Sequence, residues 1–311
     1  MNSKLIVSSS PHVRDRATTS SIMRDVIIAM VPALIASTVI FGVRAALLIA
    51  VCVVSCVVFE YLFALVAKKP QSVSDLSAVV TGILLAFNLP PTLPFWMAIV
   101  GSFVAIVVVK QLFGGIGHNF ANPAIVGRIV LMVSFSLPMT NWWVPSFTGS
   151  GIQLVSGATP LGLLAQGQPI PDYLSLAIGM RGGSLGETCG IALVLGGIYL
   201  MVRKIITVTT PLVFIGGVAV FAALLGQDPL VQVLTGGVLL GAIFMATDYS
   251  TSPTTESGKA VFALGCAILT VVIRTYGSYP EGVSFAILLM NILSPHIDNL
   301  TRTKPLGGIK A

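Results

Sequence analysis

Long apolar segments run along almost the whole chain, and short stretches that hold charged residues, glycine and proline separate them. A helix that crosses a lipid bilayer needs about 20 predominantly apolar residues. The bilayer core offers no water to an open backbone, so segments of this kind are expected to be helical. The pattern predicts ten membrane helices, at residues 22–41, 43–66, 74–89, 94–113, 120–137, 185–202, 208–226, 230–247, 258–274 and 281–296.

Composition supports the membrane assignment. Charged residues make up 9% of the 311 residues and hydrophobic residues make up 55%, whereas about a quarter of a soluble domain is charged. A transmembrane β-barrel would show short alternating segments instead. We therefore expect an all-α integral membrane protein. Its four cysteines lie in or beside apolar runs, where packing between helices is expected rather than disulfide formation.

The basic residues divide unevenly between alternate loops. If the N-terminus is cytoplasmic, only Arg44, Arg181 and Arg274 fall outside, and Arg128 lies within the fifth helix. This is the bias that the positive-inside rule describes, so we expect the net charge of +6 to set topology and not to bind nucleic acid. Both termini would be cytoplasmic. The basic residues on that side are Lys4, Arg14, Arg16, Arg24, Lys68, Lys69, Lys110, Arg203, Lys204, Lys259, Arg302, Lys304 and Lys310.

The chain divides into three parts. Residues 1–137 hold a polar N-terminal segment and five helices, residues 138–184 form a long external stretch, and residues 185–311 hold five more helices and a short cytoplasmic tail. Residues 81–92 resemble residues 235–254. Because five crossings invert the direction of the chain, the two halves would be inverted repeats, as in transporters whose sites form at broken helices.

The external stretch contains a short run of small residues, Ser156-Gly157-Ala158-Thr159. Pro160 biases Thr159 toward an extended backbone, and the small neighbours are expected to leave the threonine hydroxyl accessible to a reagent. A turn of small residues is the plainer interpretation, and composition alone favours it. An external stretch of this length without secondary structure is usually functional or disordered.

This motif and three others resemble those of a known family. The Ser-Gly-Ala-Thr motif is similar to the flavin-attachment site of the D subunit of the Rnf complex and of its homologue, the B subunit of the sodium-translocating NADH:quinone oxidoreductase. The resemblance extends to residues 114–124 (GGIGHNFANPA), 247–253 (TDYSTSP) and 279–291 (YPEGVSFAILLMN), in the expected order. The compact length and the Thr-Pro-Leu ending favour the Rnf protein over the longer homologue.

The resemblance implies two flavins. FMN would be joined through a phosphoester to the side-chain oxygen of Thr159, and a separate flavin transferase would read Ser156, Gly157 and Ala158. Such motifs often begin with an aspartate where this chain has Gln153. A second flavin, such as riboflavin, would be held noncovalently. A covalent flavin cannot dissociate from an external surface, so the protein then only orients and tunes it.

The resemblance also implies a multi-subunit setting. The complex couples electron flow between reduced ferredoxin and NAD to the export of sodium ions or protons across the bacterial cytoplasmic membrane. Its other subunits include a second FMN-bearing subunit and iron–sulfur subunits. This chain has no strand-linked G-x-G-x-x-G unit and no cysteine cluster, so we expect it to be one redox station that is catalytic only within the complex.

Polar residues at membrane depth are candidates for an ion path, because charge in lipid is costly. We consider Glu60 in the second helix, Asp248 at the end of the eighth, and Asn119 and Asn122 in the interruption before the fifth. That interruption is either a tight turn or a half-helix N-terminus that faces an ion or a flavin carbonyl. Glu60 could instead hydrogen-bond a neighbouring helix, and no histidine has metal-ligand spacing, so no metal is predicted. Further charged candidates are Asp25, Asp75, Glu187 and Arg128.

A second class of function stays open. A solute channel or ion transporter could be built on the same inverted repeat without a redox role, because a shared fold does not establish function. Flavin content distinguishes the two. A scaffold that has lost its flavin is a third possibility, supported only by Gln153.

Overall fold

The computed structural model describes residues 17–148, 151–277 and 281–302. Most of these residues are helical, which confirms the helical class. The basic residues Lys4, Arg14, Arg16, Lys304 and Lys310, and Tyr279 and Pro280 of the last sequence block, lie outside the described residues.

The first half follows the order of the predicted apolar segments. A single residue, Gly42, separates the first two helices, and its φ of 74° is one that glycine adopts without strain. The third helix is shorter than expected, since it starts only at Ser77. The elements are α1 (Thr19–Phe41), α2 (Val43–Val66), the turn η1 (Val73–Asp75), α3 (Ser77–Phe87), α4 (Phe95–Phe103), its π-helical continuation η2 (Val104–Gln111) and α5 (Pro123–Ser134).

The second half also follows the prediction, with one break. The expected eighth helix is interrupted at Gly236 and Gly237, whose φ angles of 63° and 73° do not belong to a right-handed helix. The elements are α9 (Gly190–Val202), α10 (Thr209–Leu224), α11 (Pro229–Leu234), α12 (Val238–Leu240), its π-helical continuation η3 (Gly241–Met245), α13 (Glu256–Tyr276) and α14 (Val283–Thr301).

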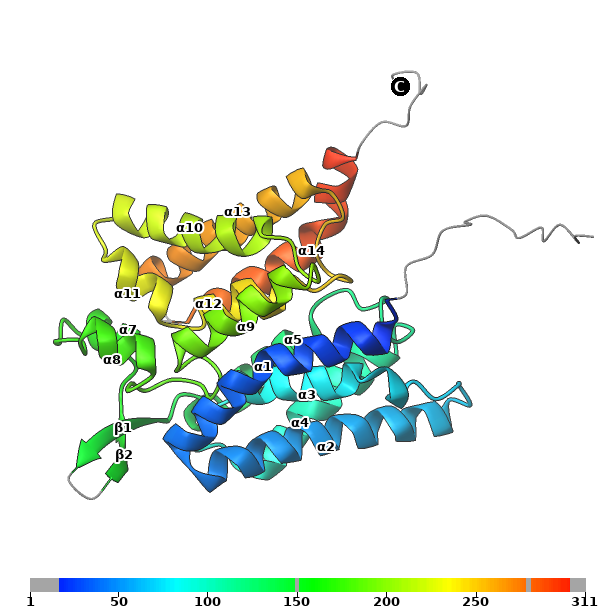
Figure 1. The fold of residues 1–311 in the computed structure, drawn as a ribbon, viewed down its shortest axis with the longest axis horizontal. Helices are drawn as coiled ribbons and strands as arrows, with labels where there is room; N and C mark the ends of the chain where they lie inside the picture. Colours follow the sequence, from blue (N-terminus) through cyan, green and yellow to red (C-terminus); the bar gives the residue numbers. More distant parts are fainter. Residues whose placement is uncertain (1–16, 149–150, 278–280, 303–311) are drawn as a thin grey trace, which may run out of the picture.

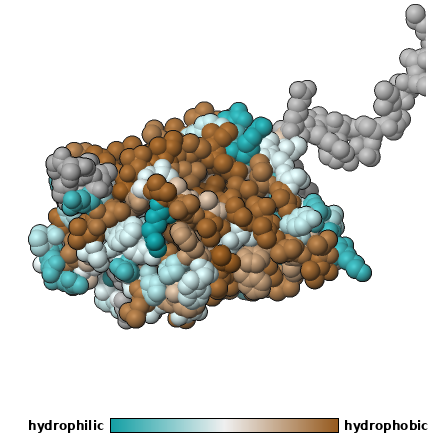
Figure 2. Space-filling model, turned by 90° about the horizontal axis from the view of Figure 1, so that it is seen from below, coloured by the Kyte–Doolittle hydropathy of each residue, from teal (hydrophilic) through white to brown (hydrophobic). Residues whose placement is uncertain are grey.

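The surface is apolar where lipid is expected. Four described helices, α1, α2, α13 and α14, are long and apolar enough to cross a membrane, and five more are shorter and apolar. Figure 2 shows a broad hydrophobic band over the helices, with hydrophilic residues gathered toward its two ends. On α2, for example, Val43, Leu47 and Val54 are exposed. A soluble monomer rarely exposes so large an apolar surface, so the chain is a multi-pass membrane protein.

The stretch that we predicted to be external, residues 138–184, is more ordered than we expected. Its strands β1 (Trp142–Thr148) and β2 (Gly151–Gly157) pair as an antiparallel hairpin in which Trp142 lies opposite Gly157. The prediction of a stretch without secondary structure was therefore wrong, and the fold is not entirely helical. In Figure 1 the hairpin lies at the end of the molecule opposite the start of α1 and the end of α14. The short helices of this stretch are α6 (Ser136–Met139), α7 (Pro160–Ala165) and α8 (Tyr173–Ile178).

The hairpin is anchored to the helices by an arginine at the start of α2. The Arg44 Nε donates to the Pro91 carbonyl oxygen at 2.9 Å, and its Nη2 donates to the Thr92 oxygen at 3.0 Å. The guanidinium also lies 5.7 Å from the ring centre of Trp143 in β1. These contacts fix the base of the hairpin against the loop that follows α3.

The two groups of helices, α1–α5 and α9–α14, meet where α1 packs on α9 and where α5 packs on α14 (Figure 1). At the first contact α9 has Gly196, and a Cβ there would lie 2.1 Å from the carbonyl oxygen of Ala29. Glycine therefore permits the close approach of the two backbones.

Replacing Gly196 by alanine is expected to destabilise the protein by about 1–3 kcal/mol, because the helices must separate to admit the methyl group. Thermal unfolding of the purified protein in detergent measures the effect. Gly216→Ala on α10 is the matched control, since nothing lies within 4 Å of its position, and it should be neutral or slightly stabilising. Equal losses in the two variants would contradict the packing assigned to Gly196.

Candidate functional site

The Ser156 to Thr159 motif joins β2 to α7. Thr159 is the N-cap of α7, and its Oγ1 accepts a hydrogen bond from the Gly162 N–H at 3.2 Å. Because the cap turns the side chain toward the helix backbone, Thr159 is only 6% exposed. The expectation of a freely presented hydroxyl was wrong. Ser156 is exposed, and its hydroxyl donates to Asn141 Oδ1 at 3.3 Å.

A recess of ≈ 380 Å³ lies beside this motif. Its walls come from the hairpin, α7 and the Gly-rich segment before α9, so the hairpin that we did not expect forms part of the candidate site. The lining residues are Val144, Val155, Ser156, Gly157, Ala158, Pro160, Leu163, Pro171, Arg181 and Gly182.

Arg181 is the charged residue of this lining and is 1% exposed. Its Nε and Nη2 donate to the backbone carbonyl oxygens of Thr188 and Glu187. Burial lowers the pKa of the Arg181 guanidinium, and the carboxylates of Glu187 and Glu281 oppose that shift. Even so, an arginine remains protonated, so the recess has a cation at its wall.

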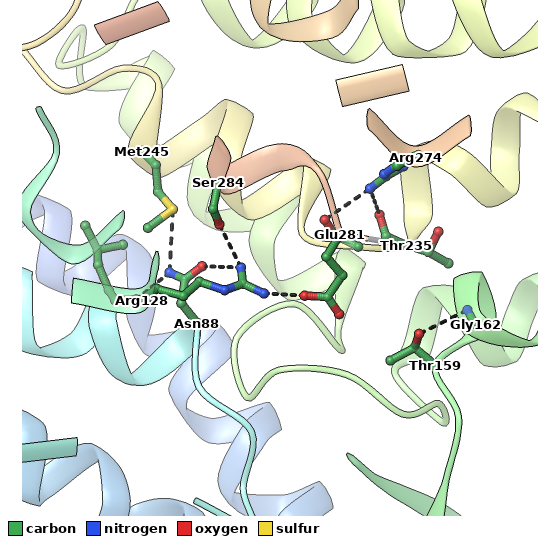
Figure 3. A network of polar contacts seen from close by, with 11 residues as sticks. Asn88, Arg128, Thr159, Gly162, Thr235, Met245, Arg274, Glu281 and Ser284 are labelled. Carbon is green, nitrogen blue, oxygen red and sulfur yellow. Dashed lines mark hydrogen bonds and ion pairs between the residues drawn. The ribbon is translucent and has the colours of Figure 1, made fainter. Parts of the chain in front are cut away.

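Two broken helices end against each other in the middle of the protein. α3 is followed by Asn88, and η3 ends at Met245. The Asn88 amide donates to the Leu84 carbonyl oxygen at 2.6 Å and contacts the Met245 sulfur at 3.5 Å. Figure 3 shows these side chains meeting beside Arg128. The polar ends of both helices are thus enclosed by protein.

Arg128 of α5 is the centre of this polar layer. Its Nη1 donates to Asn88 Oδ1 at 2.9 Å and to Ser284 Oγ at 3.0 Å, and its Nη2 pairs with the Glu281 carboxylate (Figure 3). Arg128 is 3% exposed and Glu281 is 5% exposed. A charge at this depth requires such a partner, and here the pair joins α5 to the start of α14.

A second arginine bonds the free carbonyl groups at the break between α11 and α12, in the second half of the chain. Arg274 of α13 donates to the backbone oxygens of Gln232, Thr235 and Gly236 at 2.7 to 3.1 Å (Figure 3). These carbonyls have no helical partner because α11 ends there. Arg274 therefore makes the interruption between α11 and α12 possible.

A larger cavity of ≈ 450 Å³ is lined in part by Thr19, the first residue of α1. In Figure 1 the start of α1 lies at the end of the molecule opposite the hairpin. The cavity holds three of the four residues that we proposed for an ion path, Asn119, Asn122 and Asp248, and not Glu60. Its lining residues are Thr19, Ile22, Met23, Val26, Ser77, Val80, Thr81, Leu84, Lys110, Ile116, Gly117, Asn119, Asn122, Pro123, Ala124, Leu200, Ile205, Ile206, Phe244, Thr247, Asp248, Tyr249 and Ser250.

Asn122 lies at the end of the interruption before α5 and is the N-cap of that helix. Pro123 begins a helix, as a half-helix N-terminus requires, and the Asn122 Oδ1 accepts from the Ala124 and Ile125 N–H groups. The Asn122 amide also donates to the Met245 oxygen at 3.4 Å. The helix N-terminus is therefore real, and the cap itself satisfies two of its free N–H groups.

Asp248 lies in the turn between η3 and α13 and faces the same cavity. Its carboxylate accepts hydrogen bonds from the Ser250 and Thr251 hydroxyl groups. Burial raises the pKa of the Asp248 carboxyl, while these bonds and the Asn119 side chain oppose the shift. The carboxyl is thus held by several donors beside the cavity.

Glu60 is fully buried beside that cavity, not in it. Its carboxylate pairs with Lys110 Nζ at 2.8 Å and accepts a hydrogen bond from the Ser72 hydroxyl. Lys110 also donates to Ser77 Oγ, and both Lys110 and Ser77 line the cavity. The contact with Lys110, at the end of η2, is the bond to a neighbouring helix that we had considered as the alternative.

Several important residues were not singled out from the sequence. They are mostly charged, and in a chain with 9% charged residues that rarity was a usable signal. Their partners are far away along the chain, so the pairing itself had no local signature. These residues are Asn88, Lys110, Arg181, Arg274, Glu281 and Ser284.

Replacing Arg128 by methionine should destabilise the protein by about 3–5 kcal/mol, because Glu281 then remains buried without a cation. The double variant Arg128→Met/Glu281→Gln should recover part of the loss. Lys259→Gln is the matched control, since the Glu256 side chain in its pair with Lys259 is 58% exposed and the change should cost less than about 1 kcal/mol. Thermal unfolding in detergent compares them, and similar losses for Arg128 and Lys259 would contradict the central role of the pair.

Comparison with known proteins agrees with the resemblance noted from the motifs. The chain matches the model of the NQR2, RnfD, RnfE family over residues 6–307. It is 47% identical over 310 residues to the D subunit of the Na(+)-translocating ferredoxin:NAD(+) oxidoreductase complex of Acetobacterium woodii, covering 98% of this chain and 96% of that protein.

Two further relatives carry related names. The D subunit of the proton-translocating ferredoxin:NAD(+) oxidoreductase complex of Clostridium ljungdahlii is 42% identical over 318 residues, covering 97% of this chain and 96% of that protein. The D subunit of the ion-translocating oxidoreductase complex of Halorhodospira halophila is 37% identical over 335 residues, covering 96% and 94%. The chain therefore belongs to the NQR2, RnfD, RnfE family.

Proposed function

We propose that this chain is the D subunit of an ion-translocating ferredoxin:NAD oxidoreductase complex of the Rnf type, and that it passes electrons through an FMN joined to Thr159. The observation that carries the proposal is the Ser156 to Thr159 motif beside a recess with a buried cation, in a chain 47% identical to a protein of such a complex. The chain would work only together with its partner subunits.

The residues of the recess beside Thr159 fit this group, and Thr159 itself lies between two of the lining residues, Ala158 and Pro160. The recess of ≈ 380 Å³ falls within the range of about 300–1,000 Å³ that small-molecule sites occupy. Its mostly apolar walls suit an isoalloxazine ring, and buried Arg181 suits an anion. FMN would supply the one- and two-electron chemistry there, while Thr159 retains it and the hairpin and α7 limit the access of water. Ser156, Gly157 and Ala158 would be the part that a flavin transferase reads.

The cavity at the other end suits the second, noncovalent flavin. Its volume is ≈ 450 Å³, and apolar side chains such as Val80, Leu84 and Phe244 share its lining with Asn119 and Asp248. An amide and a carboxyl can bond the donors and acceptors of an isoalloxazine edge. This assignment puts one flavin on each side of the Arg128 layer.

We also propose ten membrane crossings in two inverted repeats. In each half the third helix ends at the centre, at Asn88 and at Met245, and the ends touch. Asn88 bonds Arg128, which also bonds Ser284 at the start of α14, the last helix of the second half. Met245 accepts a hydrogen bond from Asn122, the N-cap of α5, which is the last helix of the first half. The location is the bacterial cytoplasmic membrane, with both termini cytoplasmic and the hairpin external.

The partners would be the other subunits of the complex, including a second FMN-bearing subunit and iron–sulfur subunits. Electron flow would be coupled to export of sodium ions or protons, and relatives of this chain are named for each ion. Candidate residues for an ion path remain Glu60, Asp248, Asn119 and Asn122. A solute channel or transporter without a flavin is the alternative that the next experiment excludes.

Thr159→Val should abolish covalent flavin while the protein still inserts in the membrane. Intact-mass analysis and peptide mapping, with the protein made in a host that has an active flavin transferase, should find an FMN-sized increment on the Thr159 peptide of the unaltered chain only. Thr140→Val is the matched control, because the Thr140 hydroxyl is exposed at the base of the hairpin and bonds only nearby backbone oxygens. Flavin that persists on the Thr159 variant, or an unmodified Thr159 peptide in the unaltered chain, would refute the attachment.

In the Thr159→Val background any remaining flavin is noncovalent, which allows the cavity to be tested. Adding Asn119→Leu should reduce acid-extractable flavin about fivefold or more, because a hydrogen-bonding group of the cavity is lost. Asn299→Leu, at an exposed asparagine of α14 that lines neither cavity, should leave the amount unchanged. A full complement of flavin in the Asn119 variant would place the second flavin elsewhere.

A further inference from the structure

We propose that Arg181 binds the phosphodiester that would join FMN to Thr159. This inference rests on the proposed attachment, and it assigns a role to a residue that the motif does not contain. Three independent features of the described residues carry it: the position of Arg181, its free N–H groups and the charge balance around it.

The position follows from the segment before α9. Arg181 lines the recess together with Ser156, Gly157 and Ala158. Its neighbour Gly182 packs on the motif backbone, since a Cβ there would lie 3.2 Å from the Ala158 carbonyl oxygen. The segment that carries Arg181 therefore lies directly against the residue before Thr159.

The Arg181 guanidinium is held by two hydrogen bonds, and one of its three nitrogens is left without a partner in the described residues. Two of its nitrogens, Nε and Nη2, bond the carbonyl oxygens of Thr188 and Glu187. The Nη1 is buried and has no hydrogen-bond partner within the described part of the chain. An unpaired buried donor is costly, and an N–H group of arginine is well matched to a phosphate oxygen.

The other two buried arginines of this region have no free terminal nitrogen. Both terminal nitrogens of Arg128 are bonded, to Asn88, Ser284 and Glu281, and both of Arg274 are bonded to backbone and side-chain oxygens around Thr235. Among these three arginines of the described chain, Arg181 is therefore the one whose unpaired nitrogen is a terminal one, Nη1, whereas in Arg128 and Arg274 the unpaired nitrogen is Nε.

The charge balance points the same way. Arg128 pairs with Glu281, and the carboxyl groups of Glu187 and Glu281 are the acidic neighbours of both Arg181 and Arg274. With both carboxyl groups ionised, these five described side chains carry three positive and two negative charges, so one positive charge is left without a counter-charge. A phosphodiester carries one negative charge at neutral pH. Buried charges are stable only when paired, and this ester would complete the pairing.

The consequence is that Arg181 fixes the direction in which the flavin chain leaves Thr159. An ester held by Arg181 would start beside the recess that Arg181 lines. The arginine would thus orient the flavin, while the covalent bond only retains it.

Dipolar dephasing between phosphorus-31 and nitrogen-15 tests the inference on the intact protein. The flavinylated protein is labelled with nitrogen-15 in arginine only and reconstituted in a glycolipid that contains no phosphate, so the flavin ester is the only phosphorus. A guanidinium in direct contact should dephase the phosphorus signal strongly. Arg181→Lys should remove the dephasing, and the control Arg44→Lys, at an external arginine bonded to the loop after α3, should retain it.

The outcomes separate this inference from the proposed function. A flavinylated chain whose phosphorus signal is not dephased, or is dephased equally in the Arg181→Lys variant, overturns the role of Arg181. A chain without any covalent phosphorus overturns the attachment itself. If Arg181→Lys does not insert in the membrane, Arg128→Lys and Arg274→Lys are measured instead. Dephasing that survives in both variants supports Arg181 as the contact. Dephasing that is lost in either variant contradicts it.

Discussion

Enclosure of broken helix ends is the constraint on which this structure depends. In lipid, each free backbone carbonyl or N–H group must find a partner within the protein. Here α3 and η3 both end in the middle of the molecule, and Asn88 and Arg128 enclose those ends. Arg274 does the same for the carbonyls at the end of α11. Charged residues are rare because the membrane penalises them, and Arg128 and Arg274 bond groups where the helices break.

The same polar layer divides the molecule into two compartments. On one side lies the recess beside Thr159, and on the other lies the cavity with Asn119 and Asp248. Under the proposed function each compartment holds a flavin, and the Arg128–Glu281 pair lies between them. Any ion that crosses within this chain would have to pass that pair or move it. The arrangement therefore connects the electron route with the most deeply buried charges of the polar layer.

The helices could be predicted from the sequence, because apolar length and breaks at glycine and proline are local signals. Pro123 marked the start of α5, for instance, whereas the break at Gly236 within the eighth predicted segment was not predicted. The hairpin was missed because β1 contains Pro145, a residue that is unusual within a strand, and because the stretch is rich in glycine and serine. The pairing of Arg128 with Glu281 was missed because it joins residues 153 positions apart. The burial of Thr159 was missed because the capping bond was not considered.

The most direct test of the account is a high-resolution electron cryo-microscopy map of the whole complex that contains this chain. The account predicts continuous density from the Thr159 side-chain oxygen to a flavin beside Arg181, and a second planar density in the cavity at Asn119 and Asp248, with the Arg128 layer between them. An unmodified Thr159 in a fully active complex, with electrons carried past this chain by other subunits, would contradict it.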